Sequence, residues 1–313
     1  MKIENIDDLH VLVQTARTGT LTAAASALGV TSAAASATLK RLETQLGVRL
    51  FERSTRAMRL TAQGQTLLDY ATRALDLVAE GEAQVTADRT EMVGLIRLAA
   101  PSDLTRSTLL PWLDEFLQRH PGVRLALSIG DRTLDVVRDE LDLALRYGTL
   151  ADSRLVVRRL ITVEPVVVAA PSYLARHAAP KSPLDLTRHN CLAYDRAGRP
   201  HRTWRFLRGR KWTEVRVNGD RSVDDAALAR QWALAGAGIL LKTPIEQRLD
   251  MAEGRLVRLL RDWQTESYPL HVLLPSGRFL PHRVKALVDF LAAKFEQVAL
   301  ELAKAHLPNP LRG

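Results

Sequence analysis

Residues 20–60, TLTAAASALGVTSAAASATLKRLETQLGVRLFERSTRAMRL, decide the fold of the N-terminal part of this chain. They hold two short segments of helical pattern on either side of a tight turn at 29–32, followed by a basic arm with strand-like alternation. Two helices joined by a short glycine-containing turn form a helix-turn-helix, which places its second helix in the major groove of DNA. With the arm as a wing, the stretch predicts a winged helix-turn-helix.

The helices around the turn can be delimited from local signals. Apolar residues recur at helical spacing from Ile6, and Gly19 ends the segment, so the first helix should cover about 6–18. Thr20 or Thr22 should cap the second helix, which is rich in alanine and can therefore approach its neighbours closely.

Thr31 or Ser32 should cap the third helix. Its apolar residues follow one another at steps of three or four and should form one buried stripe: Ala35, Leu39, Leu42 and Leu46. The opposite side of this helix should face DNA. The expected DNA-binding residues there are Thr31, Ser32, Ala33, Ser36, Ala37 and Lys40.

These residue types suit base contacts. Serine hydroxyls such as those of Ser32 and Ser36 can donate to or accept from base edges. The methyl groups of Ala33 and Ala37 can contact a thymine methyl. The start of the helix can also meet a phosphate. The alternative is a generic alanine-rich helical hairpin without a DNA partner.

The arm supports the DNA-binding interpretation. Short strands are expected at 49–51 and 58–60, and the tip between them carries Arg53 and Arg56. Arginines at a wing tip can reach phosphates or the minor groove. The alternative is a solvated charged hairpin.

The formal net charge of +9 does not locate the DNA-binding region by itself. Residues 1–90 hold 10 Lys and Arg against 10 Asp and Glu, so the whole surplus lies in 91–313. Within the N-terminal part only 40–60 is basic, with a net charge of +4. Residues 188–216 hold nine basic residues against two acidic ones. That second cluster is expected to be a solvated face, or else to attract an anionic effector or contact flanking DNA.

A long helix should follow over about 62–88, capped by Thr61. Small and apolar residues repeat in it with heptad spacing: Leu67, Ala71, Ala74, Val78, Gly81 and Val85. Such a seam favours a homodimer, which would present two recognition helices to a roughly palindromic operator. The alternative is a helix that packs on its own domain.

From residue 94 the pattern changes to alternating strands and helices. Strands at 95–100, 123–129 and 141–145 with helices at 109–119 and 133–139 predict a mostly parallel, doubly wound sheet. A second set runs from 161 to about 266, a strand follows at 270–274, and a helix at 281–298 closes the chain. Two such lobes would enclose a cleft at the carboxyl ends of their strands.

Polar or glycine positions after these strands are the candidate effector-binding residues. They are Ser102, Gly130 and Arg146 in the first lobe and Thr203 and Ser222 in the second. Amides near Ser102 could hold a carboxylate and Arg146 could pair with an anion, which indicates an anionic effector. The alternatives are a plain helix cap for Ser102 and an ordinary ion pair for Arg146.

Little in the sequence indicates catalysis. GxSxG, P-loop and HExxH motifs are absent, and the eight histidines lack metal-ligand spacing, so neither an enzyme nor a metal or cofactor is expected. Cys191 is the only cysteine and is expected to be a buried apolar residue. With no secretory signal and no long apolar run, we expect a cytoplasmic protein without a membrane segment. A solute-binding protein would leave the first 60 residues unexplained.

Over its whole length the chain resembles the LysR-type transcriptional regulators. The stretch TLKRLE-xx-LGVRLFER-S/T-x-R is specific to that family, and HPGV at 120–123 and DLALR at 142–146 look like its effector domain. The resemblance assigns base contacts to Ser32, Ala33, Ser36 and Ala37 and wing contacts to Arg53 and Arg56. It places Ser102, Gly130, Arg146 and Thr203 near the effector cleft. Many relatives carry Gln and Arg where this chain has Ser32 and Ala37, which favours DNA-shape and wing contacts here.

The expected architecture is therefore α+β in three parts. A winged helix-turn-helix covers 1–61, a linker and dimerisation helix covers 62–90, and a two-lobed α/β effector domain of the periplasmic-binding-protein-like (type 2) kind covers 91–313. The first lobe should take about 91–161 and 267–300, and the second about 162–266. The resemblance implies a DNA-binding transcriptional regulator controlled by a small molecule, acting as a dimer or tetramer and contacting RNA polymerase.

Overall fold

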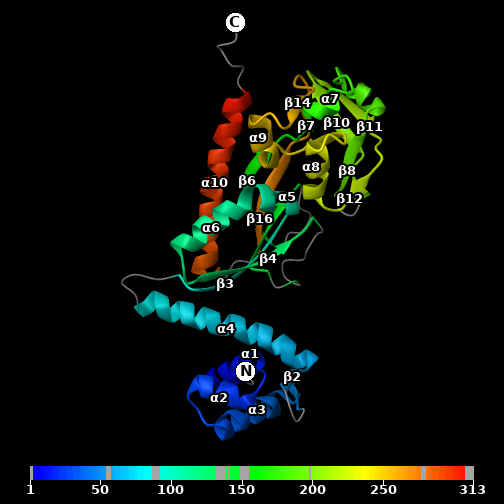
Figure 1. Ribbon diagram of the computed structural model, residues 1–313. Coiled ribbons are helices and arrows are strands. Elements are labelled where there is room, and N and C mark those ends of the chain that lie inside the picture. The colour runs from blue at the N-terminus through cyan, green and yellow to red at the C-terminus, as the bar shows by residue number, and fades with distance from the viewer. Residues whose placement is uncertain are drawn as a thin grey trace. The chain divides into compact units, whose positions relative to one another are not determined.

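The computed structural model describes residues 3–53, 58–86, 92–131, 139, 141–148, 155–196, 199–275 and 280–306. The chain divides into two compact units, 1–91 and 92–313 (Figure 1).

The N-terminal unit is three helices, a two-stranded wing and a long fourth helix (Figure 1). The elements are α1 (Asp7–Thr18), α2 (Leu21–Leu28), α3 (Ser32–Leu46), β1 (Phe51–Arg53), β2 (Met58–Leu60) and α4 (Ala62–Thr86). The helix-turn-helix predicted from the sequence is α2 and α3 with the turn between them.

Side-chain caps set where the helices of this unit begin. The Thr20 hydroxyl accepts from the backbone N–H of Ala23 at 3.2 Å, and the Thr31 hydroxyl accepts from that of Ala34 at 3.1 Å. Of the alternative caps, Thr20 and Thr31 are therefore the ones used, because a cap oxygen must reach a free N–H of the first turn. Gly29 ends α2 at φ 67°, a left-handed conformation that glycine adopts without steric cost.

The core of the N-terminal unit confirms most of the predicted stripe on α3. Ala35, Leu39 and Leu42 are buried; Leu46 packs partly against the cluster of Leu39 and Leu42, whereas Ala35 packs with Val11 and Ala25. Leu39 and Leu42 meet Leu12 of α1, so the side of α3 facing the unit's interior is apolar. The other side is left for contacts outside the unit.

The first wing strand begins later than predicted, at Phe51 instead of residue 49. The backbone N–H groups of Leu50 and Phe51 donate to the Glu43 carboxylate at 2.8 and 3.3 Å, so α3 holds the chain there. The ladder begins with Phe51 opposite Leu60.

Helix α4 divides into two parts along its length. Thr61 caps it as predicted, its hydroxyl accepting from the Gly64 N–H at 2.9 Å. Of the predicted seam, Ala71 is buried and Leu67 partly buried in the unit's own core, whereas Val78 is 42% exposed. The alternative of a helix packed on its own domain therefore holds for the first half of α4. The side chain of Val85 lies outside the described residues.

The C-terminal unit contains two main sheets. The first has the strand order β4-β3-β5-β16-β6. Its strands are β3 (Gly94–Ala100), β4 (Val123–Ile129), β5 (Leu143–Tyr147), β6 (Val156–Val163) and β16 (Tyr268–Leu274). We call this sheet, with the segments packed on it that are described next, the first lobe.

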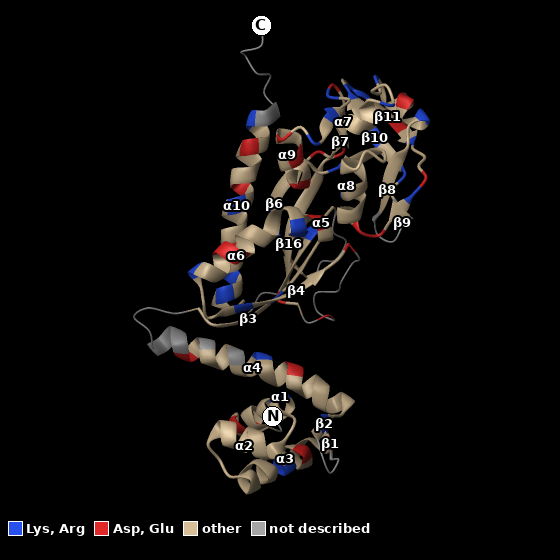
Figure 2. Ribbon diagram, viewed as in Figure 1, with Lys and Arg blue, Asp and Glu red and all other residues tan. Residues whose placement is uncertain are grey.

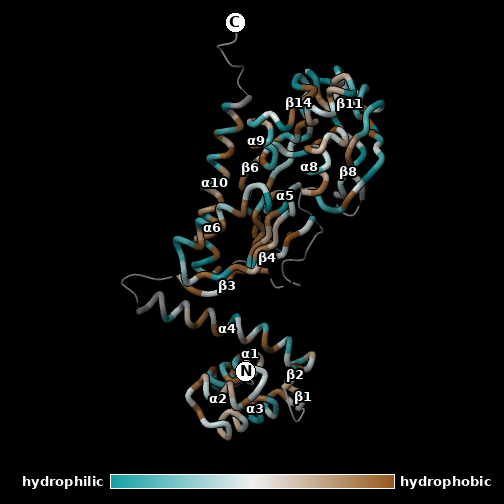
Figure 3. The backbone as a smooth tube through the Cα atoms, in the orientation of Figure 1, coloured by the Kyte–Doolittle hydropathy of each residue, from teal (hydrophilic) through white to brown (hydrophobic). Residues whose placement is uncertain are grey.

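Helices of the first lobe connect and cover its sheet. They are α5 (Ser102–Leu104), the π-helical turn η1 (Thr105–Leu109), α6 (Leu110–Arg119) and α10 (His282–His306). Apolar residues alternate with polar ones along α10, as Figure 3 shows, and Leu287, Leu291 and Phe295 are buried in the lobe's core. The helix predicted at 133–139 lies, apart from residue 139, outside the described residues.

The expectation of a mostly parallel sheet is only partly correct. Strand β3 pairs in parallel with β4 and β5, but β16 pairs antiparallel with both β5 and β6. The reason is that β16 returns from the second lobe. It lies between β5 and β6, and a strand that enters a sheet after so long a connection can run in either direction, which local sequence does not encode.

The second lobe holds a six-stranded sheet, with β12-β8-β13-β7-β14 in order and β9 paired to β8, and a three-stranded sheet, β11-β10-β15. The six strands are β7 (Val166–Ala169), β8 (Cys191–Arg196), β9 (Arg199–Pro200), β12 (Ser222–Val223), β13 (Ile239–Lys242) and β14 (Val257–Leu259). The three others are β10 (Thr203–Arg208), β11 (Lys211–Arg216) and β15 (Gln264–Thr265). Its helices are α7 (Pro171–Leu174), η2 (Pro183–Arg188), α8 (Ala226–Leu234) and α9 (Pro244–Ala252). Cys191 is buried, as predicted.

Candidate DNA-binding surface and effector site

The outer face of α3 carries the predicted base-reading residues. Ser32, Ala33, Ala37 and Lys40 are exposed and Ser36 is half-buried, opposite the buried stripe that starts at Ala35. Thr31 stands at the helix start as its cap. The face is small and polar with one cation, which suits close approach to base edges and a phosphate.

Two interactions fix the orientation of α3 within its unit. Arg41 of α3 forms a two-pronged ion pair with Asp8 of α1, a residue that is almost fully buried. Glu43 binds the chain that enters the wing. Since both partners of α3 belong to the same unit, the reading face and the wing are presented together.

The wing itself is described only in its strands. Arg53 ends β1, but its side chain lies outside the described residues, as does all of Arg56. Their predicted contacts with DNA remain predictions.

Ser102 lies at the junction of the two lobes. It is 2% exposed at the start of α5, and its hydroxyl donates to Asp225 of the second lobe at 2.9 Å. Its backbone N–H donates to Asp131 at 3.2 Å. Asp131 also accepts from the N–H of Ala226, the first residue of α8, at 2.7 Å. The alternative of a plain helix cap is therefore wrong: the N-cap of α5 is Pro101, and the Ser102 hydroxyl joins the two lobes.

The other predicted effector residues lie on different elements of the two lobes, some next to this junction and some not. Gly130 directly precedes Asp131, and a Cβ on it would meet nothing within 4 Å, so space is open beside it. Arg146 lies on β5 opposite His271. Ser222 begins β12, shortly before Asp225, whereas Thr203 is exposed on β10, opposite Arg216. The contacts described for this part of the chain join Ser102 to Asp131 and Asp225 and do not include Thr203.

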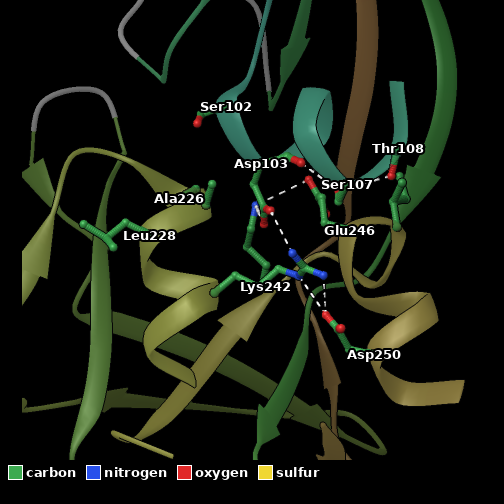
Figure 4. A network of polar contacts seen from close by, with 12 residues as sticks. Ser102, Asp103, Ser107, Thr108, Ala226, Leu228, Lys242, Glu246 and Asp250 are labelled. Atoms are coloured by element: carbon green, nitrogen blue, oxygen red, sulfur yellow. Dashed lines mark hydrogen bonds and ion pairs between the residues drawn. The ribbon is translucent and has the colours of Figure 1, made fainter. Parts of the chain in front are cut away.

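A buried charge network next to Ser102 escaped the sequence analysis. The Lys242 ammonium lies 3.3 Å from Asp103 and 3.4 Å from Glu246, and all three side chains are almost fully buried (Figure 4). Arg230 of α8 binds Asp250 of α9 at 2.5 Å and lies 3.9 Å from Asp103. The available signal was a lone lysine ending the apolar strand that holds Ile239 to Leu241.

Burial sets the electrostatics of this network. It raises the pKa of Asp103 to about 6, although Lys242 opposes the shift. Burial also disfavours the Lys242 ammonium, but the carboxylates of Glu246 and Asp103 outweigh it and raise the pKa of Lys242 above its usual value. The Lys242 ammonium of the second lobe is paired with a carboxylate from each lobe, Asp103 and Glu246. Moving the lobes apart would leave buried charges without their partners.

The basic residues at 188–216 gather on the hairpin of β10 and β11 and the segments beside it, as Figure 2 shows. Arg205 is paired with Glu266, and its guanidinium lies 5.1 Å from the ring centre of Trp212. Arg208 lies 5.4 Å from the ring centre of Trp263. These contacts fit a solvated face whose arginines pack on neighbouring aromatics.

Neither a metal site nor a membrane-spanning helix occurs among the described residues. Among them, no group of three or more His, Cys, Asp or Glu residues is arranged to hold a metal ion. None of the helices that the structure describes has the length and apolar character needed to cross a membrane.

Comparisons with known proteins agree with the geometry. Residues 6–65 match the family described as bacterial regulatory helix-turn-helix protein, lysR family, and residues 89–296 match the LysR substrate binding domain. The chain is 32% identical over 301 residues to the transcriptional regulator PtxR of Pseudomonas aeruginosa, covering 96% of both chains. It is 29% identical over 290 residues to the transcriptional activator TtdR of Escherichia coli, covering 93% of both.

Solved structures show the same architecture. CrgA of Neisseria meningitidis, a LysR-type transcriptional regulator, aligns with a TM-score of 0.60 and 30% identity over 94% of this chain and 99% of that one. The full-length virulence activator AphB of Vibrio cholerae shares the fold, with a TM-score of 0.57 and 24% identity over 93% and 99% of the two chains. The protein is thus a DNA-binding transcriptional regulator with an effector-binding domain rather than an enzyme, and it belongs to the LysR family.

Proposed function

We propose that this regulator binds a roughly palindromic operator as a dimer or tetramer and that a small anionic effector at the lobe junction controls it. The observation that carries the DNA-binding part is the exposed face of α3, which is small and polar and lies opposite a buried apolar stripe. Residues 1–61 bind DNA, 62–90 link and dimerise, and 91–313 bind the effector in two lobes, about 91–161 with 267–300 and about 162–266.

Base recognition is assigned to Ser32, Ala33, Ser36 and Ala37. Lys40 and the backbone N–H groups in the first turn of α3 are assigned to phosphates. Arg53 and Arg56 are assigned to the DNA backbone or the minor groove, which they reach from the wing. Because the reading face lacks long side chains, specificity should depend on close packing against thymine methyls and on DNA shape.

Dimerisation is assigned to the second half of α4. Support comes from its exposed apolar side chains, since Leu77 and Val78 are each more than two-fifths exposed although large apolar side chains favour burial. Gly81 lies one turn further on, and a Cβ there would meet nothing within 4 Å, so another helix can approach closely. Two units joined this way would present two copies of α3 to half-sites of one operator.

The effector is assigned to the neighbourhood of Ser102, Gly130, Arg146, Thr203 and Ser222. Support comes from the junction at Ser102, where groups from both lobes meet and a bound ligand can favour one lobe arrangement over another. The same proposal places the protein in the cytoplasm, in contact with RNA polymerase.

The test is a footprint of the full-length protein on the DNA upstream of its own gene, at fixed salt. A two-fold symmetric protected site whose extent changes with a small carboxylate from a metabolite panel would support the proposal. Protection that never shows two-fold symmetry would contradict the dimer, and protection that ignores every small anion would contradict the assigned effector class.

A further inference from the structure

Asp131 connects the starts of two helices that belong to different lobes. It follows β4 of the first lobe, and its Oδ1 accepts from the N–H of Ser102 at 3.2 Å, where α5 begins. Its Oδ2 accepts from the N–H of Ala226 at 2.7 Å, where α8 begins. One carboxylate therefore satisfies one amide from each lobe, the pattern with which proteins bind a small carboxylate between two amides.

A second carboxylate crosses the junction in the opposite direction. Asp225 of the second lobe caps α8, accepting from Ala227 at 2.8 Å, and also accepts from the Ser102 hydroxyl at 2.9 Å. Ser102, which the sequence marks as an effector residue, thus has both its N–H and its hydroxyl bound by carboxylates of this same chain. An incoming anion cannot use either donor until a carboxylate leaves.

Other charged groups lie close to this place. Lys242 is almost fully buried behind the junction, and Asp131 is among the carboxylates that raise its pKa. The two amides donate to the Asp131 carboxylate directly, whereas the charge of Lys242 is already paired with Asp103 and Glu246.

We propose that Asp131 is an internal carboxylate ligand that latches the two lobes, and that an anionic effector acts by replacing it on the Ser102 and Ala226 amides. This rests on the proposed effector site at the lobe junction. Since Asp131 is tethered, its local concentration far exceeds that of a free carboxylate, so an effector needs further contacts beyond its own carboxylate. The effector binds the arrangement in which Asp131 has left the two amides, and its binding energy shifts the lobes toward that arrangement.

The test uses the full-length Asp131→Ala variant and formate, a carboxylate of the size that the truncation removes. Hydrogen–deuterium exchange is followed in the segments 102–110 and 226–234. Loss of the bridge should speed exchange in both segments together, by about tenfold or more, because each loses a charge-assisted hydrogen bond. Formate, compared with chloride at equal ionic strength, should restore protection in both segments of the variant and change nothing in the wild type.

Asp185→Ala is the matched control. The Asp185 carboxylate also accepts from two backbone N–H groups, those of Lys181 and Ser182 at 2.9 and 2.8 Å, but both lie in the second lobe. Its loss should speed exchange locally and leave 102–110 unchanged. If Asp131→Ala does not fold, Asp131→Asn keeps the shape of the side chain and loses one acceptor, and it should speed exchange in one or both segments without a formate response.

Several results would overturn the latch. They are faster exchange in only one segment of Asp131→Ala, no restoration by formate, or an Asp131→Asn protein with wild-type exchange. Operator binding by the same proteins separates this from the proposed function. If the wild type binds its operator but Asp131→Ala shows no coupled change in exchange, only the latch is contradicted. If formate rescues Asp131→Ala but the wild type does not bind its operator, only the proposed function is contradicted.

Discussion

Arg41 and Asp8 form a two-pronged ion pair that ties the recognition helix to α1. Nε of Arg41 lies 3.1 Å from Oδ2 of Asp8 and Nη2 lies 2.5 Å from Oδ1. The carboxylate is almost fully buried while the guanidinium is half exposed, so the pair forms at the edge of the core. It anchors α3 to α1 through a residue that lies beside the reading face, four positions after Ala37.

We predict that Asp8→Asn lowers the thermal unfolding midpoint and weakens operator binding together, since an amide cannot pair with both nitrogens of the guanidinium. Asp7→Asn, one residue earlier and exposed, is the control and should leave both unchanged. Differential scanning calorimetry and a binding titration measure the two effects. Equal midpoints for the two variants would show that the ion pair does not orient α3.

Gly64→Ala should destabilise the N-terminal unit. An added Cβ would lie 1.9 Å from the backbone oxygen of Leu50, which cannot move away without disturbing the wing. We expect a loss of about 1–3 kcal/mol, as for other overpacked sites. Gln63→Ala, in the same turn of α4 but exposed, should be close to neutral. Urea unfolding of both variants tests this, and a neutral Gly64→Ala would contradict the close approach.

Lys40→Ala should weaken binding to every DNA sequence alike. If the exposed Lys40 ammonium contacts one phosphate, the slope of log K against log salt falls by about 0.9. Titrations at several salt concentrations measure the slope. Lys304→Ala removes an exposed charge from α10 and should leave the slope intact. An unchanged slope in Lys40→Ala would remove this residue from the interface.

Val78→Asp should convert the oligomer to smaller species and weaken operator binding, because it places a charge on the exposed apolar part of α4. Gln63→Asp puts the same charge on the same helix outside this part, and should assemble like the wild type. Sedimentation velocity compares the two. An unaltered oligomer in Val78→Asp would place the interface elsewhere.

The buried Asp103 predicts an unusual pH dependence. Its pKa is raised from an ordinary 3.8 to about 6, mainly by burial. Between these values the folded protein binds more protons than the unfolded chain, so this group makes stability fall as pH rises from about 4 to about 6, by up to about 3 kcal/mol. Asp103→Asn should remove that fall. Unfolding free energies measured across this range test it, and parallel curves for the two proteins would contradict the shift.

Local sequence was enough for the helix-turn-helix. The cap at Thr31, the stripe from Ala35 to Leu42 and the turn at Gly29 all act within one or two turns of helix, where side-chain spacing and backbone preference decide the outcome. The same holds for Thr61 at the start of α4.

Tertiary structure decided against which neighbour each helix or strand packs or pairs. The seam of α4 looked continuous, yet Ala71 is buried in its own domain and Val78 is not, because only the first half of the helix packs against that core. The antiparallel entry of β16 depends on the path back from the second lobe. Nothing local to β16 specifies that path.

The junction of the two lobes at Ser102 shows the division most clearly. The sequence by itself determined that Ser102 follows a strand and opens a helix, because both signals are local. Only the folded chain brought the N–H of Ala226 to the carboxylate of Asp131, 95 residues away in the sequence. The physical reason is that a hydrogen bond between distant segments depends on how whole lobes pack, and lobe packing is the sum of many contacts that no single stretch of sequence contains.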